Sequence, residues 1–261
     1  MSGRFEDRVA VVTGSGSGIG AAVASALLAE GATVVGLDLA HSDSLVAEFG
    51  DAFSAIRTDV TTETEIESAI AAVIAEHGKL DLAFNVAGAS RGAPITQMER
   101  SQWDFTVDLV LTGVFLSTKH EARAMTGGGA IVNIGSINGR IPMYGGSAYV
   151  SAKAGVEAFT RNAALELGRH GIRVNSVLPG LVETPLTSGY RGVPALLEAF
   201  TDRIVLGRTA TVQEIAGPAL YLASDDASYV TGASLVVDGG WDVANYPDLT
   251  KFLPGDSSGT P

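Results

Sequence analysis

The chain has 261 residues, of which 46% are hydrophobic, and this is enough for one large domain with a sizeable core. It contains no cysteine, which excludes disulfides, thiolate metal sites and thiol catalysis and suits a reducing cytoplasm, the location that we expect. The formal net charge of -12 disfavours nucleic acid and anionic membranes as partners, and no apolar run reaches the length of about 18 residues that would indicate a membrane span.

Short apolar runs alternate with longer helical patterns along the chain. Most runs are hydrophobic throughout, which is typical of parallel strands that are buried on both faces. We expect strands at residues 9–12, 33–37, 53–58, 82–86, 130–134, 173–177 and 235–237, and helices at 18–30, 63–77, 99–125, 151–169 and 212–223. Because strands alternate with helices, the sequence predicts an α/β fold with one doubly wound sheet of about seven parallel strands flanked by helices.

The domain organisation follows from the same pattern. No linker or repeat interrupts it, so residues 1–253 are predicted to form a single domain. The last residues, 254–261, are polar and turn-forming, and we expect them to be a flexible tail.

A glycine-rich segment follows the first expected strand and precedes a helix. It reads Thr13-Gly14-Ser15-Gly16-Ser17-Gly18-Ile19-Gly20. Glycines allow a tight turn and a close backbone approach to a pyrophosphate, and the N-terminus of the following helix supplies free N–H groups. An ordinary glycine-rich turn is the alternative, but the position between a buried strand and a helix favours a dinucleotide-binding loop.

Asp38 lies at the end of the second expected strand. In this position a carboxylate can accept hydrogen bonds from both hydroxyls of an adenosine ribose, and it would repel a 2′-phosphate. No Lys or Arg occurs between Thr13 and Gly31 to offset that repulsion. The sequence therefore favours NAD over NADP, with a solvated strand-end Asp as the alternative.

Tyr149 and Lys153 are four residues apart, so on a helix they share one face. A free phenol has a pKa of about 10, and lowering it to about 7 needs roughly 4 kcal/mol. A positive charge ~4 Å away supplies about that much at an effective dielectric near 20. The pair is therefore a candidate acid/base, and Ser136 upstream could hold a substrate oxygen. A half-exposed Tyr beside a solvated Lys is the alternative.

Together these motifs resemble the short-chain dehydrogenase/reductase family over roughly residues 5–241. Further segments carry the resemblance: Asp59-Val60, Asn85-Val86-Ala87-Gly88 and Pro179-Gly180-Leu181-Val182-Glu183-Thr184. The resemblance implies a Rossmann-type fold and NAD as cofactor. The cofactor-binding residues that it implies are Gly14, Ser17, Gly18, Ile19, Gly20, Asp38, Leu39, Asp59, Val60, Asn85, Ala87, Gly88, Tyr149, Lys153, Pro179, Gly180, Val182 and Thr184.

The resemblance also implies catalytic roles. Tyr149 would be the general acid/base, Lys153 would lower the pKa of its phenol and bind the nicotinamide ribose, and Ser136 would orient the substrate oxygen. It implies a homotetramer and a substrate loop at about residues 185–206. Val110 stands where many family members carry an Asn that helps to relay protons, and a water path helped by Asn138 is our hypothesis for its substitute.

The sequence therefore predicts an NAD-dependent oxidoreductase that interconverts a secondary alcohol and a ketone by hydride transfer. We expect a small to medium, largely apolar substrate. We also expect no metal, since none of the four histidines has metal-ligand spacing. Two alternatives stay open. One is a 3-oxoacyl thioester reductase, and the other is a dinucleotide-binding sensor without catalysis, for which Val110 is the support.

Overall fold

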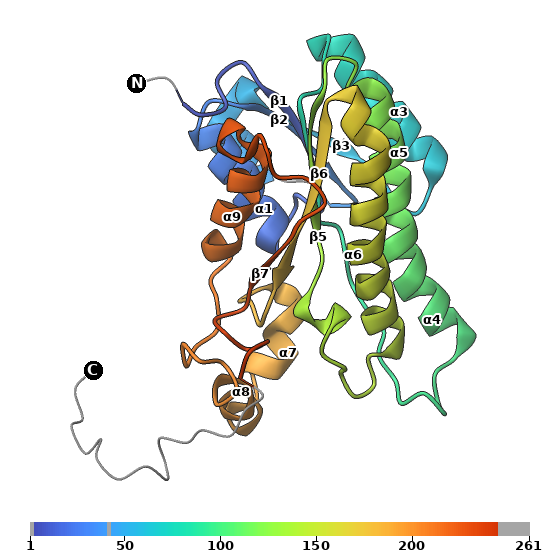
Figure 1. The fold of residues 1–261 in the computed structure, drawn as a ribbon, viewed down its shortest axis with the longest axis vertical. Helices are drawn as coiled ribbons and strands as arrows, with labels where there is room; N and C mark the ends of the chain where they lie inside the picture. Colours follow the sequence, from blue (N-terminus) through green and yellow to red (C-terminus); the bar gives the residue numbers. More distant parts are fainter. Residues whose placement is uncertain (1–2, 41–42, 245–261) are drawn as a thin grey trace, which may run out of the picture.

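Seven parallel strands form one sheet in the computed structural model of the chain, which describes residues 3–40 and 43–244 (Figure 1). The strands are β1 (Val9–Thr13), β2 (Thr33–Asp38), β3 (Phe53–Arg57), β4 (Leu82–Asn85), β5 (Gly129–Ile134), β6 (Ile172–Pro179) and β7 (Ser234–Val237). Their order is β3-β2-β1-β4-β5-β6-β7. This confirms the predicted doubly wound α/β fold. The chain adds β2 and β3 on one side of β1, and it adds β4 to β7 on the other side, so the order of the strands switches between β1 and β4. Proteins of the α/β class bind ligands outside the carboxyl ends of the strands at such a switch point.

Helices cover both faces of the sheet (Figure 1). On one face lie α1 (Gly18–Ala29), α2 (Asp43–Phe49) and α9 (Gln213–Ala223), and on the other lie α3 (Glu63–His77), α5 (Gly113–Ala124) and α6 (Ser147–Leu167). The helix α4 (Arg100–Val107) leads through a π-helical turn, Asp108–Thr112, into α5. Two short helices, α7 (Ser188–Arg191) and α8 (Pro194–Thr201), follow β6 beyond its carboxyl end.

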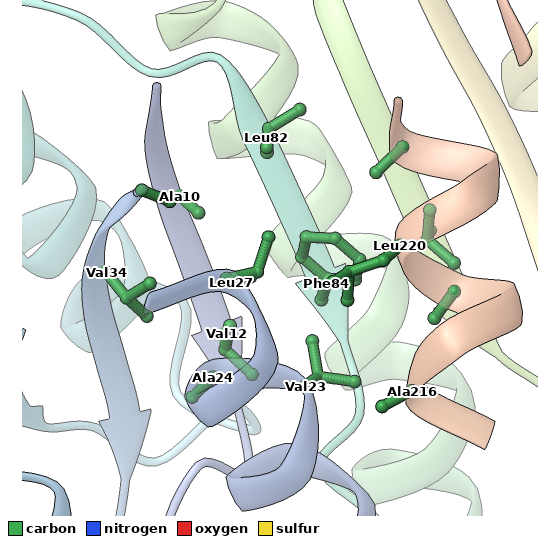
Figure 2. Packing of buried hydrophobic residues seen from close by; sticks show 14 of the residues in the cluster. Ala10, Val12, Val23, Ala24, Leu27, Val34, Leu82, Phe84, Ala216 and Leu220 are labelled. Carbon is green, nitrogen blue, oxygen red and sulfur yellow. The ribbon is translucent and has the colours of Figure 1, made fainter. Parts of the chain in front are cut away.

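Alternate side chains of the strands enter two separate cores. On β1, Ala10 and Val12 pack into one hydrophobic cluster, and Val9 and Val11 pack into the other. Figure 2 shows the first cluster, in which Phe84 of β4 lies between α1 and α9. Because both faces of each central strand are buried, the strands read as continuous hydrophobic runs in the sequence.

Several predicted boundaries were wrong. The helix expected at 99–125 is divided by the π-helical turn, and the helix expected at 151–169 begins earlier, at Ser147, so that Tyr149 already lies within α6. The sequence patterns did not predict α2, α7 and α8, which are too short to show a clear helical period. The substrate loop expected at 185–206 therefore contains two helices.

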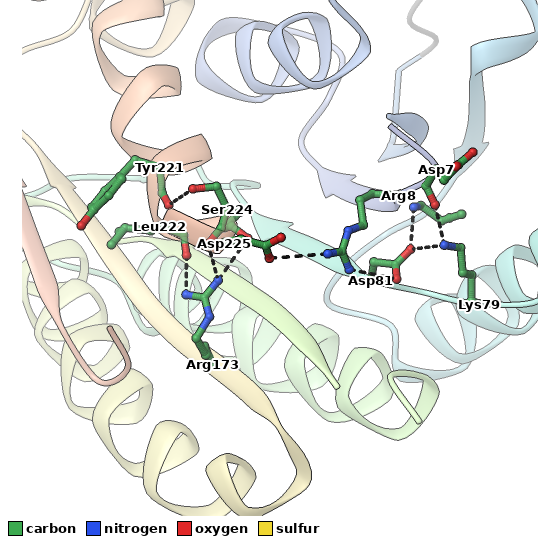
Figure 3. A network of polar contacts seen from close by, with 11 residues as sticks. Asp7, Arg8, Lys79, Asp81, Arg173, Tyr221, Leu222, Ser224 and Asp225 are labelled. Atoms are coloured by element: carbon green, nitrogen blue, oxygen red, sulfur yellow. Dashed lines mark hydrogen bonds and ion pairs between the residues drawn. The ribbon is translucent and has the colours of Figure 1, made fainter. Parts of the chain in front are cut away.

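Arg173 of β6 ties the sheet to the end of α9 (Figure 3). Its Nη1 donates to the carbonyl of Leu222 at 2.7 Å, and its Nη2 donates to the carbonyls of Ala223 at 3.1 Å and Ser224 at 3.0 Å. Carbonyls at a helix C-terminus have no hydrogen-bond donor within the helix and carry partial negative charge. The guanidinium supplies both the N–H donors and a positive charge. Burial lowers the pKa of Arg173 from its ordinary value.

In the described part of the chain, no helix is both long and apolar enough to cross a membrane. Nor do its His, Asp and Glu side chains form a group of three or more that could hold a metal ion. The tail expected at 254–261 lies outside the described residues.

Candidate functional site

A cleft of about 460 Å³ opens at the carboxyl ends of the central strands. It contains the glycine-rich segment at one side and the Tyr149 and Lys153 side chains at another, so the fold brings together motifs far apart in the sequence. All the predicted site residues except Asn85 line it. The predicted residues that line the cleft are Gly14, Ser17, Gly18, Ile19, Gly20, Asp38, Leu39, Asp59, Val60, Ala87, Gly88, Ser136, Tyr149, Lys153, Pro179, Gly180, Val182 and Thr184.

Sequence reasoning missed other lining residues. These are Leu37, Thr58, Val86, Ala89, Leu109, Ile134 and Gly135, whereas Pro185, Leu186 and Thr187, which also line the cleft, fall within the substrate loop expected at 185–206. Most are neighbours of a recognised motif, and a rule that each strand end contributes its flanking residues would have found them. Leu109 has no such signal, because the π-helical turn that directs it was not predicted.

The glycine-rich segment has a backbone that leaves room for a ligand and no room for side chains. Gly14 has φ +70°, and a Cβ there would lie 2.8 Å from the Cα of Ala87. A Cβ at Gly20 would lie 2.0 Å from the carbonyl oxygen of Gly14. Ser17 precedes α1 without capping it through its side chain, and the first turn of α1 holds no acidic residue, so its N–H groups can receive an anion. These features fit a dinucleotide pyrophosphate.

Asp38 is held in place by backbone donors. Its Oδ2 accepts from the N–H of Gly16 at 2.8 Å, and its Oδ1 accepts from the N–H of Ala40 at 2.9 Å. Each carboxylate oxygen has a second lone pair that can accept from a ribose hydroxyl. Asp38 lies in register with Arg57 of β3, whose guanidinium is 3.8 Å from the carboxylate of Glu65. The carboxylate acceptors at this end of the cleft fit the hydroxyls of an adenosine ribose.

Ser136, Tyr149 and Lys153 meet at the other end of the cleft. The side chains of Ser136 and Tyr149 are hydrogen-bonded to each other. The Nζ of Lys153 lies 5.8 Å from the centroid of the Tyr149 ring and donates to the carbonyl of Ile134 at 2.5 Å. The Oγ of Ser136 also accepts from the N–H of Asn138 at 3.1 Å, which fixes its direction.

Burial dominates the pKa shifts of this group. Burial of the hydroxyl raises the pKa of Tyr149, and the hydrogen bond from Ser136 opposes that increase. Burial also lowers the pKa of Lys153 to about 8, because the charged ammonium is costly to bury. That Lys153 lowers the pKa of the phenol stays a prediction.

Val110 is fully buried in the π-helical turn and packs with Val114, Ala152 and Val156 against one side of Tyr149. It therefore fixes the tyrosine ring by packing and offers no polar atom to a water. Asn138, our candidate for a substitute relay, donates its Nδ2 to the carbonyl of Ile141 at 3.2 Å.

Aromatic rings from α7 and α8 form a group with Trp241. Tyr190 is close enough to Tyr149 for the two phenols to interact electrostatically. Its ring contacts Phe200 with centroids 5.8 Å apart, and Phe200 contacts Trp241 at 5.4 Å. Tyr190 and Phe200 of this aromatic group fall within the substrate loop expected at 185–206, and Trp241 joins them from the segment after β7.

Comparison with known proteins agrees with this geometry. The family model described as enoyl-(acyl carrier protein) reductase matches residues 14–242. The chain is 43% identical to cis-4-hydroxycyclohexanecarboxylate dehydrogenase of Sinomonas cyclohexanicum, over 92% of this chain and 99% of that protein. It is 39% identical to a mitochondrial borneol dehydrogenase of Lavandula x intermedia, over 93% of each.

A solved structure has the same fold. The short-chain type dehydrogenase/reductase from Mycobacterium ulcerans superimposes with a TM-score of 0.89 at 38% identity, covering 95% of this chain and 94% of that one. The cleft, its loop and its Ser136, Tyr149 and Lys153 group thus occur in a chain that is similar over nearly its whole length to dehydrogenases. The chain belongs to the short-chain dehydrogenase/reductase family.

Proposed function

We propose that this protein is an NAD-dependent oxidoreductase that interconverts a cyclic secondary alcohol and the corresponding ketone. The observation that carries the proposal is the meeting of Ser136, Tyr149 and Lys153 in the same cleft as the glycine-rich loop. A binding module would need the loop but would gain nothing from a buried phenol and a buried ammonium, both of which cost free energy to desolvate.

The bound nicotinamide would supply hydride transfer, and this chain's residues would handle the proton. The Ser136 hydroxyl, already fixed by the N–H of Asn138, would hold the substrate oxygen beside the Tyr149 phenol. The phenol would take the alcohol proton during oxidation and return it during reduction. The Lys153 ammonium would stabilise the phenolate that forms, and the positive charge of an oxidised cofactor would lower the pKa of Tyr149 further.

Asp38 supports NAD as the cofactor. Its carboxylate is fixed by Gly16 and Ala40 and has lone pairs left for two ribose hydroxyls. A 2′-phosphate at that point would meet a fixed negative charge, since the N–H donors of Gly16 and Ala40 hold the carboxylate in the cleft.

The substrate class is supported by the aromatic group and by the relatives. Several similar proteins are named for ring alcohols: hydroxycyclohexanecarboxylate, borneol and hydroxysteroids. Tyr190, Phe200 and Trp241, whose rings meet edge to face, would offer apolar contacts to such a ring. A homotetramer is also proposed, because the apolar side chains of Phe115 and Leu165 are exposed on the outer helices α5 and α6.

The test is a cofactor-reduction assay on the purified protein. It uses NAD and NADP in turn with 4-hydroxycyclohexanecarboxylate, borneol, a hydroxysteroid and linear secondary alcohols. We expect reduction of NAD with a ring alcohol, and a loss of at least about 100-fold in turnover for Tyr149→Phe with unchanged NAD binding.

Tyr229→Phe is the matched control, because Tyr229 is fully exposed and the substitution again removes one phenol oxygen. NAD binding without turnover of any alcohol would favour the sensor. Turnover confined to 3-oxoacyl thioesters with NADPH would favour the thioester reductase.

A further inference from the structure

Glu121 of α5 is a carboxyl group with no exposure to solvent. Its Oε2 accepts a hydrogen bond from the Nδ2 of Asn85 at 3.0 Å. Burying an ionised carboxylate costs several kcal/mol unless a cation pairs with it. The two basic neighbours on α5 do not pair with it, because Lys119 and His120 both contact Glu63 of α3. The site therefore disfavours the charged form of Glu121.

The hydrogen bonds around Asn85 leave two acceptors without a donor. The two hydrogens of its Nδ2 face Glu121 Oε2 and Asn133 Oδ1, both at 3.0 Å, and Thr118 Oγ1 is more distant at 3.3 Å. The Oδ1 of Asn85 and the Oε1 of Glu121 accept no hydrogen bond from the residues that the structure describes. Both atoms belong to the two side chains that are already joined.

One proton would satisfy both acceptors. If Oε1 of Glu121 is protonated, it can donate to Oδ1 of Asn85 while Oε2 still accepts from Nδ2. Reversing the amide of Asn85 does not remove the need for this proton. Its Oδ1 would then face the Oε2 of Glu121 and the Oδ1 of Asn133, with acceptor against acceptor.

We infer that Glu121 is a neutral carboxylic acid, paired with the Asn85 amide through two hydrogen bonds, and that it is a positioning residue for the cleft above it. Asn85 ends β4, and the next two N–H groups, of Val86 and Ala87, donate to the Oγ1 of Thr13 at 2.9 Å and 3.2 Å. These residues form the cleft wall that meets the glycine-rich loop.

The same hydrogen bonds continue to the catalytic helix. Asn133 of β5 accepts from Asn85 and donates its Nδ2 to the Oγ1 of Thr160 at 2.9 Å. Thr160 lies on α6, which also carries Tyr149 and Lys153. The acid–amide pair thus begins a chain of side-chain hydrogen bonds that fixes α5, β4, β5 and α6 beneath the site. The positioning role rests on the proposed function, whereas the protonation of Glu121 does not.

Electrostatics agrees with the geometry. Burial raises the pKa of Glu121 to about 8, and the hydrogen bond from Asn85 opposes this only in part. Charged groups on the elements packed against α5 are directed elsewhere. Glu63 of α3 pairs with Lys119 and His120. On α6, Lys153 donates to the carbonyl of Ile134, and Glu166 accepts from Asn162. Asp108 of the π-helical turn and Arg123 of α5 are exposed.

The test compares the wild type with Glu121→Gln and Glu121→Leu. A Gln can donate from Nε2 and accept at Oε1, so it reproduces the two hydrogen bonds at every pH. Between pH 4.5 and about 8 the folded wild type holds a proton that the unfolded chain has lost. Its folding equilibrium constant should therefore fall about tenfold per pH unit relative to that of Glu121→Gln. The other titrating groups cancel in this comparison.

Two further measurements complete the test. Infrared difference spectra at pH 7 should show the band of a protonated carboxyl group in the wild type and not in Glu121→Gln. Titration with NAD should give an affinity for Glu121→Gln within about twofold of the wild type and a loss of about tenfold for Glu121→Leu, which removes both hydrogen bonds of the pair and leaves the Oδ1 of Asn85 without a donor.

Parallel pH curves for wild type and Glu121→Gln, or no carboxyl band, would overturn the neutral acid. Equal NAD affinity for a folded Glu121→Leu would overturn the positioning role. If Glu121→Leu does not fold, the affinity of Glu121→Gln decides that role, and a loss of tenfold or more would exclude it. The pH curves and the spectra require neither cofactor nor substrate, so they stand even if the proposed reaction is wrong.

Discussion

Gly20→Ala adds one methyl group where the start of α1 meets the glycine-rich loop. The new Cβ would lie 2.0 Å from the carbonyl oxygen of Gly14, 2.6 Å from its carbonyl carbon and 3.1 Å from the nitrogen of Ser15. Non-bonded carbon atoms prefer separations of about 3.5–4.0 Å, so the backbone must move by roughly 1 Å. Backbone atoms cannot rotate away as the end of a side chain can.

The cost follows from that displacement. Inserting a methylene-sized group into a packed site destabilises by about 1–3 kcal/mol, and the backbone contact places Gly20→Ala at the upper end. At about 2–4 °C per kcal/mol for a chain of this size, the melting temperature should fall by about 6–12 °C. Because Gly14 must move, the N–H groups of the loop lose their alignment, and NAD affinity should fall by at least about tenfold.

Thermal unfolding by circular dichroism and calorimetric titration with NAD measure the two effects. Gly217→Ala is the matched control, because a Cβ at Gly217 meets nothing within 4 Å in the helix α9. There the better helix propensity of alanine should add about 1 kcal/mol and leave NAD affinity unchanged. A Gly20→Ala variant that melts within about 2 °C of the wild type and binds NAD equally well would refute the close approach of α1 to the loop.

Three other substitutions test Asp38, the buried Lys153 and the contacts of Arg173 with α9. Asp38→Ser removes the fixed negative charge, so the ratio of NAD to NADP affinity should fall by at least about tenfold in parallel titrations. Burial lowers the pKa of Lys153 from 10.5 to about 8, so between these pH values the unfolded chain binds more protons than the folded one. The free energy of unfolding of the wild type should therefore rise by up to about 3 kcal/mol over this pH range. Urea unfolding of Lys153→Met should not show this rise. Arg173→Met leaves the carbonyls at the end of α9 without donors and should cost about 3 kcal/mol by urea unfolding, whereas exposed Arg203→Met should cost almost nothing.

Each of these has a result that would contradict it. An unchanged cofactor ratio would show that Asp38 does not discriminate at the ribose. Equal pH slopes for wild type and Lys153→Met would show that the lysine is not desolvated. Equal losses for the two arginine variants would show that the contacts with α9 contribute no more than an exposed side chain.

The sheet could be predicted from the sequence because parallel strands buried on both faces leave a simple pattern. The glycine-rich loop and Asp38 were recognisable for a similar reason, since each follows the end of such a strand. The same alternation of strands and helices brought Ser136 and Tyr149 to one end of the sheet.

What could not be predicted depends on contacts between distant segments. The π-helical turn leaves no mark on the hydrophobic period, and it decides that Leu109 lines the cleft while Val110 packs on α6. Glu121 would be placed on the surface by any rule that exposes charged residues. Glu121 is buried because α5 packs beside the strand β4, which carries Asn85. The sequence pattern does not state that these two elements are neighbours. The raised pKa of Tyr149 likewise reflects desolvation by neighbours from other elements.

The edge-to-face contacts of Trp241 with Phe200, and of Phe200 with Tyr190, would make the indole an optical reporter of the proposed substrate loop. The chain has two tryptophans, Trp103 and Trp241, so a Trp103→Phe variant would emit from Trp241 alone. Occupants that push Tyr190 aside would change the emission of Trp241 through Phe200. Ligands could then be ranked by fluorescence before any of them is shown to react.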